Sequence, residues 1–127
     1  MTDDVHRILV VDDDTEIRET LVEVLEDAGY EAVGASDGVE ALAQLRAPAD
    51  HWCVVLLDLM MPNMDGRTFR AEQLQDPQLS PIPVVIVSAM ADVAEAAQEL
   101  GVAAHVTKPI RLADLVQIVD RFCHRAA

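Results

Sequence analysis

Basic residues are scarce in this chain, and their scarcity limits the partners that it can have. Nine lysine and arginine residues stand against 23 aspartate and glutamate residues, which gives a formal net charge of −14. A chain so acidic would repel a phosphate backbone, so we expect no direct contact with nucleic acid. All but one of the basic residues are arginines, and Lys108 is the only lysine. A site that needs a compact ammonium group therefore has one candidate.

Cysteines and long apolar runs are also few. Cys53 and Cys123 lie in apolar stretches and lack the spacing of a metal site or of a disulfide framework, so we expect reduced thiols in the core. No run approaches the ~18 consecutive apolar residues that span a bilayer. The start, MTDDVHR, lacks the basic and apolar parts of a signal peptide. We expect a cytoplasmic protein without membrane insertion.

The pattern of apolar residues predicts a single domain, residues 1–127, in which strands and helices alternate. Strands are expected at Ile8–Val11, Glu31–Gly34, Cys53–Leu57, Val84–Val87 and Ala104–Thr107. Helices are expected from Ile17 to Ala28, from Gly38 to just before Pro48, and at Gly66–Leu74, Asp92–Leu100 and Leu112–Cys123. Such alternation predicts a doubly wound α/β fold, a parallel sheet covered by helices on both faces.

Polar residues follow four of these strands. Asp12 and Asp13 come after the first strand, Asp58 after the third, Ser88 ends the fourth and Lys108 follows the fifth. The carboxyl ends of parallel strands meet at one edge of the sheet, where such folds bind ligands. Carboxylates clustered at a partly buried edge either raise each other's pKa or bind a cation. Hard oxygen ligands favour Mg²⁺, so this edge is a candidate magnesium site.

Other acidic residues have a structural explanation. Asp14, or Asp13 with Glu16, has the spacing of a helix N-terminal cap. The pair Asp65-Gly66 is typical of a turn.

Four stretches, ILVVDDD, VVLLDLMMPNMDG, PVVIVSAM and VTKPI, occur in the order and at the spacing of one family. In them the chain resembles the receiver (response-regulator, CheY-like) domains of bacterial two-component signalling along essentially its whole length. The resemblance implies five helices around a flavodoxin-like sheet with strand order 2-1-3-4-5. It also implies a regulatory phosphoacceptor, rather than an enzyme, that a histidine kinase or a histidine phosphotransfer protein phosphorylates.

The resemblance assigns a role to each polar residue at the strand ends. Asp58 would be the phosphoacceptor, and Ser88 and Lys108 would contact the phosphoryl group. The ligands of Mg²⁺ would be Asp12, Asp13, Asp58 and the backbone carbonyl of Met60. The Lys108–Pro109 peptide bond would be cis.

The resemblance also implies a switch that links phosphorylation to a protein partner. Ser88 would move toward the phosphoryl group, and the residue at position 105 would turn into the space that it leaves. This chain has His105 where the family usually has tyrosine or phenylalanine, so an ordinary aromatic switch is in doubt. An effector protein would bind the face of the fourth helix, fifth strand and fifth helix, where Arg111, Gln117 and Arg121 are expected to be exposed.

Two other functions fit parts of the sequence. A receiver-like module that binds a partner without being phosphorylated would keep the same fold and the same acidic residues. A haloacid-dehalogenase-like phosphatase also uses a strand-end aspartate, Mg²⁺ and a lysine. That family requires Asp-x-Asp-x-Thr/Val, whereas the corresponding residues here are Asp12, Asp14 and Glu16.

Overall fold

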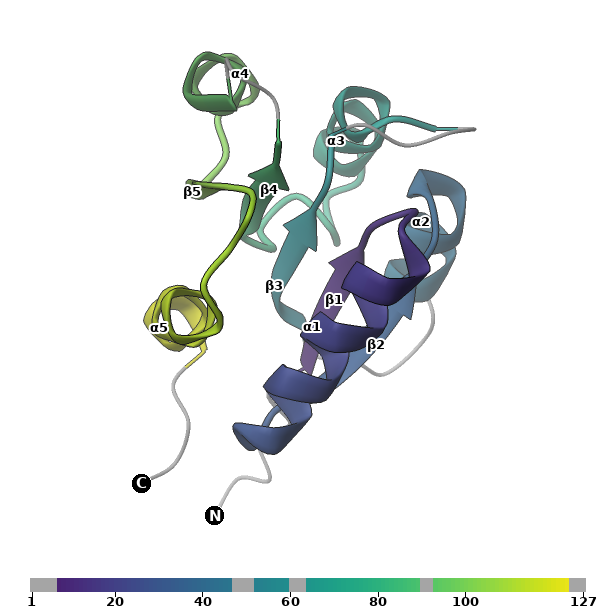
Figure 1. Cartoon of the computed structure of the whole chain (residues 1–127). Helices are drawn as coiled ribbons and strands as arrows, with labels where there is room; N and C mark the ends of the chain where they lie inside the picture. Colours follow the sequence, from purple (N-terminus) through teal and green to yellow (C-terminus); the bar gives the residue numbers. More distant parts are fainter. Residues whose placement is uncertain (1–6, 47–51, 60–63, 90–92, 124–127) are drawn as a thin grey trace.

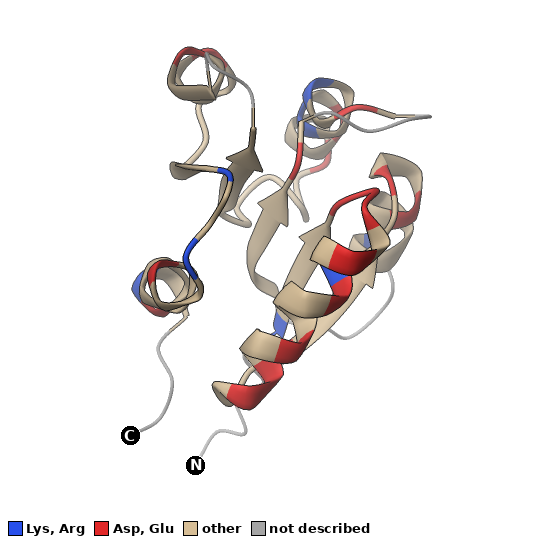
Figure 2. Cartoon of the chain, viewed as in Figure 1, with Lys and Arg blue, Asp and Glu red and all other residues tan. Residues whose placement is uncertain are grey.

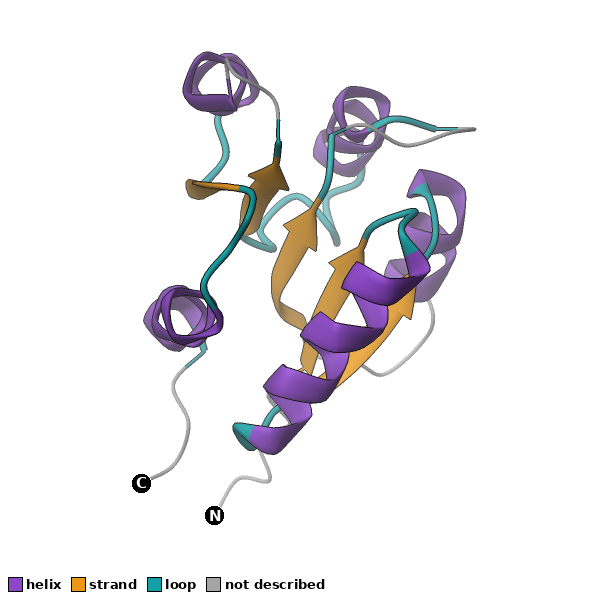
Figure 3. Ribbon diagram, viewed as in Figure 1, coloured by secondary structure: helices purple, strands orange, loops and turns teal. Residues whose placement is uncertain are grey.

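The computed structural model describes residues 7–46, 52–59, 64–89 and 93–123. Strands and helices alternate along the chain (Figure 1; Figure 3). The strands are β1 (Arg7–Val11), β2 (Glu31–Ala35), β3 (Trp52–Leu57), β4 (Val84–Ser88) and β5 (Ala104–Thr107). The helices are α1 (Thr15–Asp27), α2 (Gly38–Arg46), α3 (Gly66–Gln75), α4 (Val93–Leu100) and α5 (Leu112–Phe122). None of the helices in these ranges is long and apolar enough to cross a bilayer.

The five strands form one parallel sheet in the order β2-β1-β3-β4-β5. The order reverses beside β1, because the chain passes from β1 outward to β2 and then returns to the other side through β3. Right-handed crossovers then place α1 and α5 on one face of the sheet and α2, α3 and α4 on the other. The predicted doubly wound fold, its strand order and the five helices are confirmed in the described part of the chain.

The central strands divide their side chains between the two faces. Ile8 and Val10 of β1 pack with Leu21 and Leu25 of α1 and with α5. Their neighbours in β1 point the other way and pack against α2 and α3. This alternation follows from the two-residue period of a strand, and both faces are apolar because helices cover both. Full burial of one such side chain contributes roughly 1.5–3 kcal/mol, so the two clusters hold the helices on the sheet.

Local sequence signals account for the ends of the first helix. The Asp14 carboxylate accepts a hydrogen bond from the backbone N–H of Ile17 at 3.1 Å, so Asp14 is the N-cap that the spacing predicts. The helix stops before Gly29, which has a φ of 100°, a left-handed conformation that glycine adopts at little cost.

The two cysteines differ from their expected state. Cys53 near the start of β3 and Cys123 just after α5 form a disulfide with a Cα–Cα distance of 5.5 Å. The prediction of reduced thiols is therefore wrong for this structure. The two residues are 70 positions apart in sequence, and only the packing of α5 against the sheet brings them together. The spacing of the cysteines in the sequence does not predict this disulfide.

Candidate functional site

The backbone at the carboxyl edge of the sheet stays paired for one residue beyond the strands. The N–H of Asp12 donates to the carbonyl of Ala35 at 3.1 Å, and the N–H of Asp58 donates to the carbonyl of Val11 at 2.9 Å. On the other side, the N–H of Lys108 donates to the carbonyl of Ser88 at 2.9 Å. These bonds hold the polar residues at the strand ends in place, so their side chains project from a rigid edge.

Three carboxylates meet at this edge. Asp12, Asp13 and Asp58 each offer an oxygen, and these oxygens lie within 4.8 Å of one another. Asp12 and Asp58 are only 3% and 7% exposed, whereas Asp13 is open to solvent. Buried carboxylates this close repel one another unless a cation compensates their charge. Hard oxygen donors with one open side fit Mg²⁺, which keeps several of its waters when a protein binds it.

Lys108 is the cation present in the described part of this cluster. Its Nζ donates to Asp12 Oδ2 at 2.8 Å and to Asp58 Oδ2 at 3.2 Å. Burial alone lowers the pKa of Lys108, but the hydrogen bond to Asp12 and the charges of Asp58 and Asp12 outweigh it, so the pKa is raised above the usual lysine value. Three carboxylates and one ammonium leave a net charge of about −2, which a divalent cation would balance.

Ser88 and His105 lie on the neighbouring strands β4 and β5. Ser88 ends β4 and is fully buried, and it is paired in register with Thr107 of β5. His105 lies two residues earlier in β5 and is exposed. It lines a groove between α4 and β5, together with Ala97 and Gln98.

The remaining sequence predictions divide into those that the structure describes and those that it does not. Arg111, Gln117 and Arg121 are exposed on and just before α5, as expected. The Lys108–Pro109 peptide bond is cis, in agreement with the resemblance. Met60, the predicted carbonyl ligand, lies outside the described residues.

Two further residues position Asp12 from the first turns of α1. The backbone N–H of Asp14 donates to Asp12 Oδ1 at 2.9 Å, so the residue that caps the helix also orients the carboxylate. Arg18 Nη1 donates to the backbone carbonyl of Asp12 at 2.8 Å. The capping pattern identified Asp14 but not this contact. One feature of the sequence could have drawn attention to Arg18. It is the only basic residue in the acidic segment Thr15–Asp27.

Gly66 is a third residue whose contribution the sequence did not reveal. A Cβ at this position would lie 2.8 Å from the Cα of Leu59 and 3.0 Å from the carbonyl oxygen of Asp58. The start of α3 therefore packs directly on the backbone that follows β3, and only glycine leaves room for this approach. The next residue back, Asp65, is the N-cap of α3 rather than merely part of a turn, since it accepts from Thr68 N–H at 2.8 Å.

Comparison with known proteins gives consistent matches. The family model of the response regulator receiver domain matches residues 8–120. The transcriptional regulatory protein PdtaR of Mycobacterium tuberculosis is 35% identical over 117 residues, which are 90% of this chain and 55% of PdtaR. This chain spans about half the length of the curated relatives that it matches.

Solved structures match over almost their whole length. The chemotaxis response regulator CheY4 of Vibrio cholerae has a TM-score of 0.83 at 28% identity, over 93% of this chain and 98% of CheY4. The response regulator TrrA of Thermotoga maritima, solved in complex with Mg²⁺ and BeF, has a TM-score of 0.80 at 28% identity, over 92% of this chain and 98% of TrrA.

Proposed function

Since the chain belongs to the response regulator receiver domain family, we propose that it is phosphorylated on Asp58 and that this phosphorylation changes its surface for a protein partner. Receiver domains are regulatory phosphoacceptors, and we propose that residues 1–127 form one such domain in the cytoplasm. The observation that carries the proposal is the contact of the Lys108 ammonium with both Asp58 and Asp12, inside a cluster of three carboxylates.

The chemistry at Asp58 would be a phosphoryl transfer. One oxygen of the Asp58 carboxylate forms a bond to phosphorus, and the P–N bond of a phosphohistidine on the donor breaks. The donor imidazole leaves with the electron pair of that bond, and Asp58 becomes an acyl phosphate. Asp58 is nearly buried in the fold, but 9% of its side chain is exposed, and a donor histidine would approach it through this opening.

The other residues of the site would bind and orient the phosphoryl group. Lys108 already donates to Asp58 Oδ2, so its ammonium lies where the oxygens of a phosphoryl group on Asp58 would arrive. Ser88, at the end of the neighbouring strand, would donate its hydroxyl to the same group. Mg²⁺, bound by Asp12, Asp13, Asp58 and the carbonyl of Met60, would neutralise charge on the phosphoryl oxygens.

Two kinds of protein partner follow from this proposal. A histidine kinase or a histidine phosphotransfer protein would supply the phosphoryl group. An effector protein would bind the face formed by α4, β5 and α5, where Arg111, Gln117 and Arg121 are exposed. His105 lies on this face and lines its groove, so we propose that His105 and Ser88 form the switch between the phosphorylation site and the effector.

The test is to incubate the protein with Mg²⁺ and acetyl phosphate and to measure its intact mass. We expect the mass to rise by one phosphoryl group in the wild type and in Asp27→Asn, an exposed residue at the end of α1. We expect no adduct in Asp58→Asn or without Mg²⁺. If Mg²⁺ binds but no adduct forms, the domain is a binding module without phosphorylation, and sustained hydrolysis of a phosphate monoester would show a phosphatase.

A further inference from the structure

The disulfide lies at the opposite end of the sheet from the phosphorylation site. Cys53 is the second residue of β3, and Asp58 follows the last residue of the same strand, about 17 Å further along. Cys123 follows the last residue of α5, whose first residue comes shortly after Lys108. β3 and α5 therefore each run from the acidic site at one end to the disulfide at the other.

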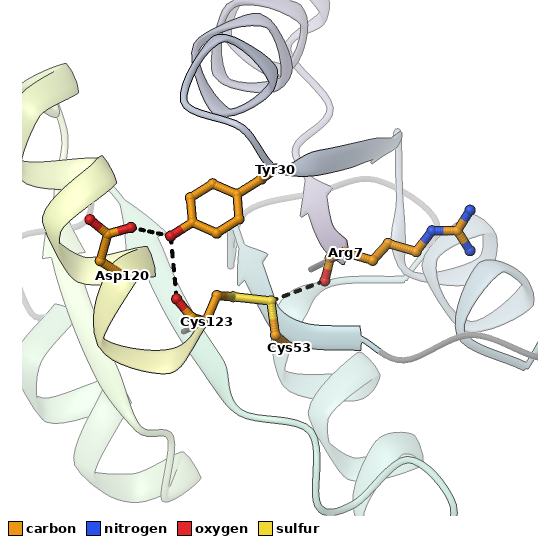
Figure 4. The surroundings of a disulfide bond; sticks show 5 residues. All are labelled: Arg7, Tyr30, Cys53, Asp120 and Cys123. Atoms are coloured by element: carbon orange, nitrogen blue, oxygen red, sulfur yellow. Dashed lines mark hydrogen bonds between the residues drawn. A yellow bond between two sulfur atoms is a disulfide. The ribbon is translucent and has the colours of Figure 1, made fainter. Parts of the chain in front are cut away.

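In the described part of the chain, the disulfide and a hydrogen-bonded tyrosine both attach the end of α5 to the rest of the fold. Figure 4 shows the second: the Tyr30 hydroxyl lies between the Asp120 carboxylate and the Cys123 carbonyl. Tyr30 donates to Asp120, and its oxygen is 3.3 Å from the Cys123 carbonyl oxygen. Val119 and Leu115, one and two turns earlier, are fully buried against the sheet. Of these described contacts, the disulfide alone is covalent, and redox chemistry can make and break it.

The two cysteine residues differ in exposure. Cys123 is 1% exposed, whereas Cys53 is partly exposed. Cys53 is therefore the residue of the pair that a reductant in solution would approach first. Cys53 Sγ also lies 3.4 Å from the Arg7 carbonyl oxygen, a contact drawn as a dashed line in Figure 4. A disulfide sulfur carries no proton, so this contact becomes a hydrogen bond only after Cys53 is reduced to a thiol.

We propose that Cys53 and Cys123 form a reversible thiol–disulfide site, with a cellular dithiol as its reductant, and that its redox state controls how firmly the end of α5 is attached to the sheet. In reduction, a thiolate of the dithiol attacks Cys53 Sγ, the S–S bond breaks, and Cys123 leaves as a thiolate that takes a proton. The second thiol of the reductant then displaces Cys53. The protein gains two electrons and two protons, and the dithiol becomes a disulfide.

Reversibility follows from the compartment, and this step rests on the proposed function. Phosphohistidine donors are made in the cytoplasm, where thiol reductants keep most disulfides open and those that form are usually transient. The redox state would then act on α5, one of the three elements of the proposed effector face. After reduction no covalent cross-link holds the last turn of α5, and in the described residues the hydrogen bond of Tyr30 and the apolar packing of Val119 and Phe122 remain. This turn carries the exposed Arg121. The proposed partner surface would therefore respond both to phosphorylation of Asp58 and to the redox state of the cysteine pair.

The first experiment tests the site itself and needs no phosphodonor. The protein is equilibrated in mixtures of reduced and oxidised dithiothreitol, alkylated with a maleimide under denaturing conditions, and weighed by intact mass spectrometry. We expect no labels per chain at the oxidising end, two at the reducing end, and the unlabelled form again after reoxidation. Two labels under every oxidising mixture would overturn the proposal, and so would a pair that reforms only between chains.

The second experiment tests the effect on α5 by amide hydrogen exchange in the same two states. We expect residues 119–122 to exchange at least about tenfold faster after reduction, while β1 and β3 remain protected. The increase should be larger in Tyr30→Phe, which lacks the second attachment. Equal exchange in the oxidised and reduced wild type would show that the disulfide does not control α5.

The controls separate this proposal from the proposed function. In Cys53→Ala/Cys123→Ala, exchange of α5 should be fast and independent of the reductant; if this variant does not fold, the comparison of the oxidised and reduced wild type still decides. All these measurements are made without phosphodonor. A chain that is never phosphorylated can therefore still show the redox effect, and a chain without the redox effect can still be phosphorylated.

Discussion

At the scale of single residues, the position of Lys108 requires a compact positive charge. Its ammonium lies between two nearly buried carboxylates, and its charge compensates part of theirs. All the remaining lysine or arginine positions of the chain hold arginine. An ammonium on a flexible stem can follow phosphoryl oxygens as they form, whereas a planar guanidinium requires a fork of acceptors in fixed directions.

Lys108→Arg should therefore keep the charge but slow the chemistry. We expect phosphorylation of Asp58 by acetyl phosphate to fall by about tenfold or more, because the guanidinium cannot take the place of the ammonium between Asp12 and Asp58. The measurement is the initial rate of adduct formation by intact mass. Arg111→Lys, an exposed change of the same kind just before α5, should leave the rate unchanged. An unaltered rate in Lys108→Arg would remove the geometric role given to the lysine.

Gly66 provides a second test at this scale. In Gly66→Ala the new methyl group would meet the Leu59 Cα at 2.8 Å and the Asp58 carbonyl at 3.0 Å, both backbone atoms that cannot move aside. We expect a loss of roughly 1–3 kcal/mol in the free energy of unfolding by urea denaturation, together with slower phosphorylation. Gly34→Ala is the matched control for stability, because the three atoms nearest to its new methyl group belong to the flexible Arg18 side chain and not to the backbone. Equal losses in the two variants would contradict the argument.

At the scale of elements, the start of α3 depends on a charged cap. Asp65 is exposed, and the backbone hydrogen bond from Thr68 is the main reason that its pKa lies below the usual aspartate value. The folded-state pKa is lower than the unfolded one, so the cap stabilises the protein above the unfolded pKa of about 3.9 and this contribution is lost as the pH falls through the folded value.

Two substitutions of Asp65 separate the hydrogen bond from the charge. Asp65→Ala should cost about 1 kcal/mol of unfolding free energy at pH 7, because the Thr68 N–H loses its acceptor. Asp65→Asn keeps an acceptor and should cost less. Urea denaturation between pH 7 and pH 3 should show the gap between wild type and Asp65→Asn closing toward the acid end. A gap that widens toward acid would mean that the carboxylate is not the stabilising form.

A buried polar clasp connects α3 with the end of α4. Arg70 donates from Nε to the Leu100 carbonyl at 3.1 Å and from Nη2 to the Gly101 carbonyl at 3.0 Å. Its Nη1 donates to Gln73 Oε1 at 2.7 Å. The fully buried Gln73 in turn donates to the carbonyls of Leu79 and Ile82, each at 3.0 Å. The clasp thus satisfies carbonyls at the end of one helix and in the loop before β4.

Gln73→Met should break this clasp while keeping the side-chain volume. It leaves one guanidinium N–H and the Ile82 carbonyl without this partner and removes one of the two donors to the Leu79 carbonyl, so we expect a loss of about 2–4 kcal/mol of unfolding free energy. Gln75→Met, in the same helix but exposed, should change it by less than about 0.5 kcal/mol. Both values come from urea denaturation, and a Gln73→Met variant as stable as Gln75→Met would show that the clasp contributes little.

At the scale of the whole molecule, the sequence predicted what depends on local periodicity and missed what depends on tertiary contact. The strands and helices follow from apolar spacing, and the convergence of Asp12, Asp58 and Lys108 follows once the strands are parallel. The disulfide could not be predicted, because it depends on where the end of α5 packs. The same holds for Arg18, since only the folded backbone brings its side chain to the Asp12 carbonyl.

The net charge of −14 is a property of the whole molecule that lowers its stability. Acidic residues cover the exposed side of α1 and recur on α2 and around the strand ends (Figure 2). Such a chain repels itself, and any salt will relieve part of this repulsion by screening. Stabilisation by magnesium salts alone would therefore not identify a magnesium site, and the test must hold ionic strength constant.

At constant ionic strength, replacing NaCl with MgCl₂ should still raise the melting temperature of the wild type, with a saturating dependence on Mg²⁺. At a concentration about ten times the dissociation constant, the gain would be about 1.4 kcal/mol. Asp13→Asn should lose most of this gain, because Asp13 offers one of the three clustered oxygens. Glu23→Gln removes the same charge from an exposed position on α1 and should keep it. If the two variants respond alike, the gain does not come from binding at the three carboxylates, and they are not a site for the ion.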